Sequence, residues 1–307
     1  MTRKDSGDIV FERVLTIFPC LILLIVAGIF FELVSTSWPS IQKFGLKFIG
    51  TSTWDPVFEN FGALPFIFGT LVTSFVALLL AIPIGLGTAI YLAEYAPHKI
   101  QKTIAMLIDL LAAIPSVIYG LWGIFVLVPV MREHVQPFLG KYLGFLPFFQ
   151  GPNYGVGILS ASVILAIMIV PFIISVSREV ILAVPSVYKE SAYAMGATRW
   201  EVMSTVILGY AKPGIMGAII LAMGRAIGET MAVTMIIGNN VKISWSLFSP
   251  GYTLASVIAN EFAEAASKLY LSALIEIGLV LFLVSILVNM IARFLIWSVT
   301  HGQAVRV

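Results

Sequence analysis

The chain of 307 residues is strongly apolar: 59% of its residues are hydrophobic, and it contains 18 basic and 16 acidic residues. A soluble domain carries about 25% charged residues, whereas this chain carries 11% and has a mean hydropathy of +1.01. This composition excludes a soluble enzyme, a nucleic-acid-binding protein and a disordered chain, because each needs more polar surface. The net charge of +2 and the single Cys20 indicate neither an anionic partner nor an internal disulfide. The sequence therefore predicts an integral membrane protein.

Six transmembrane helices are the predicted elements, because a helix needs about 20 mostly apolar residues to cross a hydrocarbon core of roughly 30 Å. A further uncharged segment at 243–260 is polar and interrupted by Pro250-Gly251, so we expect an extramembrane or re-entrant loop there. The fold class is thus an all-α integral membrane protein. In chain order, the spans are expected at Val14–Phe31, Phe66–Leu92, Leu110–Met131, Gly155–Ser177, Gly214–Gly238 and Tyr270–Trp297.

The distribution of Lys and Arg predicts the orientation, because basic residues are enriched in cytoplasmic loops. Eleven basic residues belong to the N-terminus, the second loop, the fourth loop and the C-terminus, six belong to the other loops, and Arg225 is inside a span. Both termini and the fourth loop are therefore expected to be cytoplasmic. The expected organisation is a cytoplasmic tail (1–13), a six-helix transmembrane domain (14–297) with a long cytoplasmic loop (178–213), and a second cytoplasmic tail (298–307).

The fourth loop contains the signals of a short helix, a tight turn and a second helix. Ser186 is a suitable N-cap for a helix over Val187–Met195, and Gly196 is a typical residue for the left-handed position that follows a helix. Thr198 and Glu201 have the spacing of a capping box for the next helix. These signals alone leave an ordinary connector and a docking element as equal alternatives.

Arg225 and Glu229 are charges deep inside a predicted span, four residues apart and so on one face of a continuous helix. Near the bilayer midplane an Arg costs roughly 2.5–3.5 kcal/mol on insertion scales, so it should face protein or water. In a functional interpretation, the guanidinium attracts an oxyanion, while Glu229 orients it and weakens its hold enough for the anion to leave. In a structural interpretation, the two residues form a buried ion pair. The functional interpretation is favoured, because ionisable residues inside membranes mostly mark pathways.

The remaining polar residues are weaker candidates. Asp109 is expected at the start of the third helix, where the helix dipole stabilises a carboxylate, with a gating contact to another span as the alternative. We expect Pro115 to kink that helix, Ser116 to face a pore and Glu276 to reach water near the outer interface. The three His residues lack metal-ligand spacing, so no metal site is expected, and the chain shows no nucleophile–base arrangement.

Several segments resemble the permease subunits of ATP-binding-cassette (ABC) importers. The segment YKESAYAMGAT (188–198) is similar to the "EAA" loop of that family, which couples the permease to its ATPase subunit. The segments IPSVIYGLWG (114–123) and GRAIGETMA (224–232) resemble more specifically the phosphate-specific permeases of PstC type. By this resemblance the coupling residues are Glu190, Ser191 (which replaces the first Ala of the motif), Ala192, Ala194, Gly196, Ala197 and Thr198.

The resemblance implies a type I (MetI-like) ABC importer permease, a multi-pass protein of the bacterial cytoplasmic membrane that forms a channel for inorganic phosphate. It implies that Arg225 and Glu229 serve phosphate translocation. It also implies a PstA-type partner permease, two ATPase subunits that use ATP and Mg, and an extracytoplasmic phosphate-binding protein. This chain contains no Gly-x-x-x-x-Gly-Lys-Ser/Thr motif, so we expect it to hydrolyse nothing and to bind no cofactor. A sulfate or molybdate permease, a proton-coupled secondary anion transporter and a membrane scaffold or sensor are the alternatives.

Overall fold

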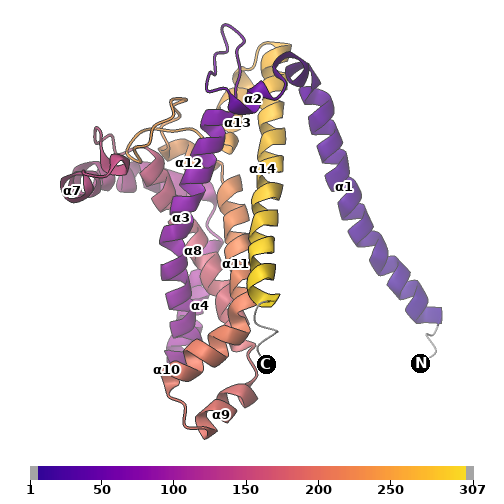
Figure 1. Ribbon diagram of the computed structural model, residues 1–307, viewed down its shortest axis with the longest axis vertical. Helices are drawn as coiled ribbons and strands as arrows, with labels where there is room; N and C mark the ends of the chain where they lie inside the picture. The colour runs from indigo at the N-terminus through magenta and orange to yellow at the C-terminus, as the bar shows by residue number, and fades with distance from the viewer. Residues whose placement is uncertain (1–5, 302–307) are drawn as a thin grey trace.

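The computed structural model describes residues 6–301. Long helices form a stem, and one helix stands apart from it (Figure 1). The stem contains α3 (Leu64–Ile90), α8 (Ile158–Leu182), α11 (Leu208–Gly228) and α14 (Lys268–His301), and the separate helix is α1 (Ser6–Phe44). The prediction of an all-α protein with six transmembrane helices is confirmed. Within the described residues, the helices long and apolar enough to cross a membrane are Val14–Phe44, Leu64–Tyr95, Ser116–Leu143, Ile158–Leu182, Arg199–Gly228 and Lys268–Phe294.

Some of the shorter helices make up the span Ser116–Leu143 or begin the span Arg199–Gly228, and the others connect and cap the spans. The shorter helices are α2 (Lys47–Gly50), α4 (His98–Ala112), α5 (Ser116–Trp122), α6 (Val128–Val130), α7 (Gln136–Leu143), α9 (Ser186–Ala194), α10 (Arg199–Glu201), α12 (Met231–Ile236) and α13 (Leu254–Glu261). π-Helical turns occur at Tyr91–Tyr95, Gly123–Leu127, Met131–Val135 and Val202–Ile207, and 3-10 turns at Pro147–Phe149 and Phe262–Glu264.

The two ends of the stem carry different elements. α9 and α10 lie at one end, and α2 and α13 lie at the other (Figure 1). α1 begins and α14 ends toward the end that carries α9, as an even number of spans requires. Of the tails predicted at 1–13 and 298–307, residues 1–5 and 302–307 lie outside the described residues, and the rest continue the helices α1 and α14.

Several predicted spans have different bounds in the structure. The first helix continues beyond Phe31 to Phe44, while the fourth and sixth helices shift by a few residues. The third span does not start at Leu110, because α4 ends at Ala112 and α5 begins only at Ser116. Proline has no N–H to donate and disfavours helical geometry in the residue before it, so Pro115 ends one helix instead of kinking a continuous one.

The fifth predicted span, Gly214–Gly238, is also interrupted. α11 ends at Gly228, Glu229 has an extended backbone (φ −68°, ψ 125°), and α12 begins at Met231. The break lies inside the stem, below α12 and α13 in Figure 1. A continuous helix with Arg225 and Glu229 on one face is therefore not what the chain forms.

Close packing around α8 holds the stem together. α8 is the most buried span, with 72% of its most apolar window covered by the rest of the described chain. Ala218, Ala222 and Ala226 recur every four residues on α11 and are all buried, so this stripe of small residues packs against the neighbouring helices. Gly224 and Gly228 have no neighbour within 4 Å of an added Cβ, so this Gly-x-x-x-Gly pair faces open space in the single chain.

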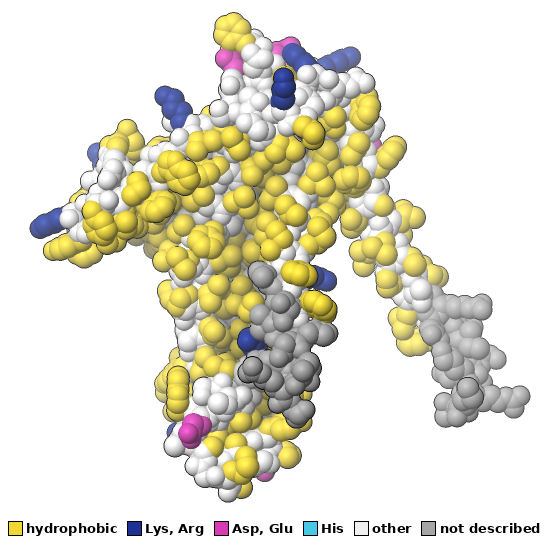
Figure 2. Space-filling model, viewed as in Figure 1, with side chains coloured by type: hydrophobic (Ala, Val, Ile, Leu, Met, Phe, Trp, Pro, Cys, Tyr) yellow, Lys and Arg dark blue, Asp and Glu magenta, His cyan; other side chains and the backbone are white. Residues whose placement is uncertain are grey.

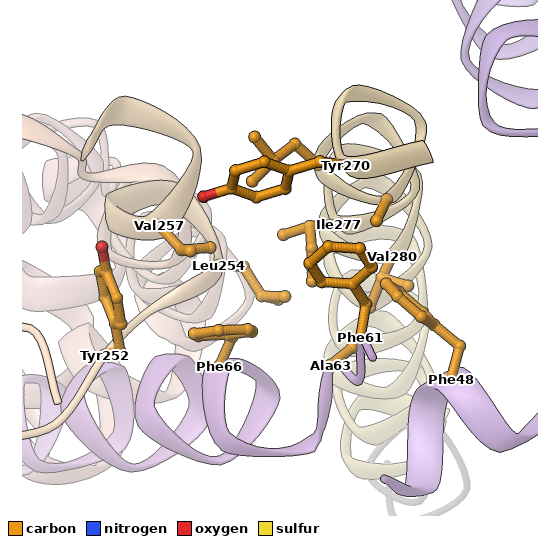
Figure 3. Packing of buried hydrophobic residues seen from close by; sticks show 12 residues of the cluster. Phe48, Phe61, Ala63, Phe66, Tyr252, Leu254, Val257, Tyr270, Ile277 and Val280 are labelled. Carbon is orange, nitrogen blue, oxygen red and sulfur yellow. The ribbon is translucent and has the colours of Figure 1, made fainter. Parts of the chain in front are cut away.

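An aromatic cluster closes the end of the stem opposite α9. Figure 3 shows Phe66 of α3, Tyr252, Leu254 and Val257 near α13, and Tyr270 of α14 converging there. One carboxylate, that of Glu261, accepts hydrogen bonds from Trp54 Nε1 and the Tyr270 hydroxyl (both 2.6 Å) and from the Tyr252 hydroxyl (3.2 Å). The segment at 243–260 is irregular up to Thr253 and then forms the short α13, so it is not a span, as predicted.

α1 joins the stem at this same end through polar contacts with α14. The backbone N–H of Ser40 donates to Ser272 Oγ (3.1 Å), and Ser272 Oγ donates to the carbonyl of Thr36 (3.1 Å). Glu276, one turn further along α14, is only 6% exposed, and its Oε2 has no hydrogen-bond partner among the described residues. The prediction that Glu276 reaches water is wrong in this chain.

The exterior of the stem is apolar. Figure 2 shows hydrophobic side chains over most of its length, with basic and acidic side chains mainly toward the ends. Because lipid is the solvent that accepts such a surface, the arrangement agrees with a multi-pass membrane protein.

We expect Gly69 of α3 to be irreplaceable by alanine. A Cβ at Gly69 would overlap the carbonyl oxygen of Tyr252, whereas a Cβ at Gly87 on the same helix would meet nothing within 4 Å. Gly69→Ala should therefore destabilise the protein by about 1–3 kcal/mol through backbone overpacking. Gly87→Ala, the matched control, should be neutral or slightly stabilising. Thermal unfolding of both variants in detergent checks this, and equal stability of the two would refute the close approach.

Candidate functional site

Arg225 lies in the last turn of α11, at the border between the packed and the open face of that helix. Its neighbours at spacings of three and four are buried Ala222 on one side and exposed Leu221 and Gly228 on the other. The side chain is half-buried, so it reaches past the packed face without being enclosed. An arginine in this position inside a membrane should face protein or water and not lipid.

The guanidinium of Arg225 stacks on an aromatic ring. Its central carbon lies 4.2 Å from the ring centroid of Phe172 on α8. A desolvated cation–π contact of this kind contributes about 2 kcal/mol, which helps to offset the cost of the charge. Arg225 Nε is buried, and none of the guanidinium nitrogens has a hydrogen-bond acceptor among the described residues. The donors of Arg225 are thus held in place and unused.

Glu229 does not pair with Arg225 among the described residues, so neither the ion pair of the structural interpretation nor the orienting contact that the functional interpretation assigns to Glu229 is present there. The reason is the helix break: beyond Gly228 the extended backbone carries Glu229 out of the register of α11. Its Oε1 instead accepts the backbone N–H of Ala232 (3.4 Å) in the first turn of α12. The residue that contacts and orients the guanidinium of Arg225 is Phe172, which no local sequence signal marks.

The predicted helix–turn–helix at 178–213 is confirmed. α9 covers Ser186–Ala194, Gly196 has φ +85°, and Thr198 and Glu201 form the predicted capping box. Pro185, and not Ser186, occupies the N-cap position. Ala192 is buried, whereas Glu190, Ser191, Ala194, Gly196 and Thr198 are exposed and Ala197 is half-buried.

Large apolar side chains surround these exposed residues. Met195 is 84% exposed and Trp200 is 72% exposed, and Val187 and Tyr193 are exposed as well. Exposed apolar patches rimmed by polar residues mark interaction sites. The loop is therefore more than an ordinary connector: it presents a surface that another protein can cover.

An ion pair that sequence reasoning missed ties α9 to the stem. Lys189 Nζ binds Glu94 Oε1 in the π-helical turn that follows α3. Both side chains are about one-fifth exposed, so water screens the pair only partly. No sequence signal joins residues 95 positions apart.

Asp109 lies in the last turn of α4, at the negative end of the helix dipole, so the predicted dipole stabilisation is wrong. Its Oδ1 accepts a hydrogen bond from Ser175 Oγ of α8 (3.3 Å), which is a contact with another span, as the alternative requires. Ser116 is the first residue of α5 and is half-buried. The gating role of Asp109 and the pore-facing role of Ser116 stay predictions.

The six possible spans and the exposed loop define a class, that of multi-helix membrane proteins with a surface for another protein. The chain belongs to the family of binding-protein-dependent transport system inner membrane components, whose model matches residues 81–300. It is accordingly a multi-pass protein of the inner membrane, and the resemblance of its motifs to ABC importer permeases is confirmed.

Three relatives show how far the similarity extends. A phosphate transport system permease protein PstC of Mesorhizobium japonicum is 46% identical over 97% of this chain and 92% of its own length. The PstC of Haemophilus influenzae is 48% identical over 93% of this chain and 92% of its own. A probable PstC of Methanocaldococcus jannaschii is 40% identical over 83% of both chains.

Solved structures share the fold. A chain of the MetNI methionine ABC transporter in an inward-facing conformation aligns with a TM-score of 0.56 at 19% identity, covering 76% of this chain and 94% of that one. A chain of a bacterial ABC transporter that imports alginate aligns with a TM-score of 0.59 at 16% identity, covering 94% and 97%. The expected MetI-like permease fold is confirmed.

We expect the Lys189–Glu94 pair to hold α9 against the stem. Glu94→Gln should increase the rate of chymotrypsin cleavage at the exposed aromatic residues of the α9 loop about fivefold, as a loss of about 1 kcal/mol implies. The exchange of both charges (Glu94→Lys with Lys189→Glu) should restore the original rate. Glu190→Gln removes the adjacent exposed carboxylate and is the matched control, which should leave cleavage unchanged. If Glu94→Lys and Lys189→Glu change the cleavage rate independently, so that their effects add in the double variant, the pairing is contradicted.

Proposed function

We propose that the chain is the channel-forming subunit of an ATP-driven importer of inorganic phosphate. The observation that carries this proposal is the free guanidinium of Arg225 inside a permease stem whose relatives at 46–48% identity are phosphate transport permeases. The planar donor fork of arginine matches the geometry of a tetrahedral oxyanion. As it passes, phosphate accepts the hydrogen bonds that the guanidinium of Arg225 can donate.

Release is as important as binding. A transport site must hold its ion weakly enough for it to leave. Glu229 lies one residue beyond α11 and keeps a negative charge near the path, although its carboxylate is bound to the start of α12. Phosphate therefore meets one fixed cation, which it can neutralise, and one carboxylate, which limits how tightly it stays.

The exposed surface around α9 is the proposed docking site for one ATPase subunit. The partner permease binds the second ATPase subunit. The sequence has no phosphate-binding loop for a nucleotide, so ATP and Mg belong to those subunits and this chain catalyses no hydrolysis. A PstA-type permease completes the channel, and an extracytoplasmic phosphate-binding protein delivers the substrate. In this arrangement α9 and both termini face the cytoplasm, in agreement with the excess of basic residues there.

The competing functions differ in substrate or in energy source. A sulfate or molybdate permease requires the same donors with another oxyanion. A proton-coupled transporter requires a titrating Glu229 and no ATPase. A scaffold function requires Arg225 and Glu229 to form a structural ion pair. It is disfavoured, because the two residues do not pair among the described residues.

The proposal is tested by Arg225→Gln in the assembled transporter. Loss of two charged hydrogen bonds, about 3 kcal/mol, should lower ATP-driven phosphate uptake into vesicles about 100-fold, while the subunits still co-elute. Arg225→Lys keeps the charge without the fork and should retain partial uptake. Lys212→Gln, which removes the other basic residue of α11, should transport normally. Normal uptake by Arg225→Gln would overturn the role of Arg225. Uptake driven by a proton gradient without ATPase would overturn the proposal that ATP is the energy source. Preferential uptake of sulfate would overturn the proposal that phosphate is the substrate.

Gly196 tests the docking surface. Its φ of +85° is strained for other residues, and a Cβ there would meet nothing within 4 Å, so any effect of substitution comes from the backbone. Gly196→Val should cost about 1–2 kcal/mol, distort the turn after α9 and reduce the amount of ATPase that co-purifies. Gly196→Asn, which tolerates the left-handed conformation, should retain ATPase binding. Undiminished co-purification with Gly196→Val would count against docking at α9.

A further inference from the structure

A pocket with both charged and apolar residues in its lining lies away from Arg225, between α4 and the end of α8. It has a volume of about 480 Å³. From α4 it is lined by His98, Gln101, Lys102 and Asp109, and from α8 by Arg178. The α4 residues recur at spacings of three, four and seven, so one face of that helix forms one wall.

The pocket gathers hydrogen-bond donors and positive charge. Lys102 has no carboxylate partner among the described residues. Arg178 Nη1 binds Glu179 Oε1 (2.6 Å), yet Arg178 Nε is buried and has no acceptor. Because α4 begins at His98, the positive end of its dipole lies at the same pocket. The buried guanidinium nitrogen can therefore donate to an anionic group that enters the pocket.

The pocket lies further along α8 than Phe172, toward the end of the stem that carries α9. Phe172, which stacks on Arg225, and Arg178 are six residues apart on α8, about 9 Å along the axis. Ser175, midway between them, donates to Asp109 of α4. Ile108 of α4 shares a hydrophobic cluster with Ala192 of α9. α8 thus connects the two basic sites along one helix.

We infer that this pocket is a second oxyanion site and binds a phosphate group through Arg178 and Lys102. Arg178 supplies directional donors and Lys102 a mobile point charge, a combination suited to phosphate. Asp109 lines the same pocket and limits affinity, as release requires. The group is either free phosphate that has passed Arg225, which rests on the proposed function, or the headgroup of an anionic lipid, which does not.

The test uses the complete transporter in lipid nanodiscs without ATP or binding protein. Cys20→Ser removes the native thiol, and Ala105→Cys places a thiol in the pocket wall. The rate at which an uncharged maleimide modifies this chain is measured by mass spectrometry while inorganic phosphate is titrated at constant ionic strength. We expect phosphate to slow modification in discs of zwitterionic lipid.

Substitutions assign the protection to the proposed donors. Arg178→Gln and Lys102→Gln should each raise the phosphate concentration needed for protection about tenfold or more. Lys99→Gln removes a base of the same helix that does not line the pocket, and it should leave protection unchanged. If the headgroup of an anionic lipid is the ligand, phosphatidylglycerol in the discs slows modification without phosphate, and Arg178→Gln reverses this effect.

The inference is overturned if neither phosphate nor phosphatidylglycerol slows modification, or if Arg178→Gln and Lys102→Gln keep full protection. The outcome is independent of the proposed import, because labelling needs no transport. Arg225→Gln should lose phosphate uptake and still show protection at the second pocket.

Discussion

Close packing against α8 is the constraint on which the other arrangements in the stem depend. Apolar side chains gain little by leaving lipid for protein, so membrane helices associate where small residues let backbones approach. A Cβ at Gly85 of α3 would lie 2.8 Å from Ile173, and one at Gly214 of α11 would lie 2.5 Å from Val180. Because α3 and α11 both pack closely against α8, the position of α8 along its axis is fixed. Phe172 is thereby held against Arg225, and Ser175 against Asp109.

The interruption after α11 determines what kind of site Arg225 can form. In a continuous helix, Glu229 would lie one turn from Arg225 and could neutralise it. The break at Gly228 directs the carboxylate to the backbone of α12 and leaves the cation without an acceptor. Irregular backbone inside a membrane protein is tolerated where it is buried in protein or lines a cavity. The broken helix and the free guanidinium are therefore two aspects of one arrangement.

The spans and the turn at Gly196 could be predicted because their causes are local: apolar run length, a left-handed position and a capping box. The break at Glu229 could not, because glycine and threonine also occur inside membrane helices and the Arg–Glu spacing favours a continuous one. Pro115 was visible, but whether a proline kinks or ends a helix depends on tertiary partners for the freed backbone groups. Phe172 and Glu94 reach their cationic partners only through the fold, so no local pattern marks them.

α1 packs against α14 along its C-terminal part, from the ring contact of Phe30 with Phe282 to the hydrogen bond between Ser40 and Ser272, and no residue of its most apolar window is buried by the described chain. Its membrane segment of 31 residues is about 46 Å long, longer than a hydrocarbon core of roughly 30 Å. The helix must therefore lean or protrude, and its free end is displaced sideways from the stem (Figure 1). α1 is therefore attached to the stem along its C-terminal part, and its N-terminal part lies apart from the stem (Figure 1). Because of this helix, the subunit occupies a wider area of the membrane than the packed stem does.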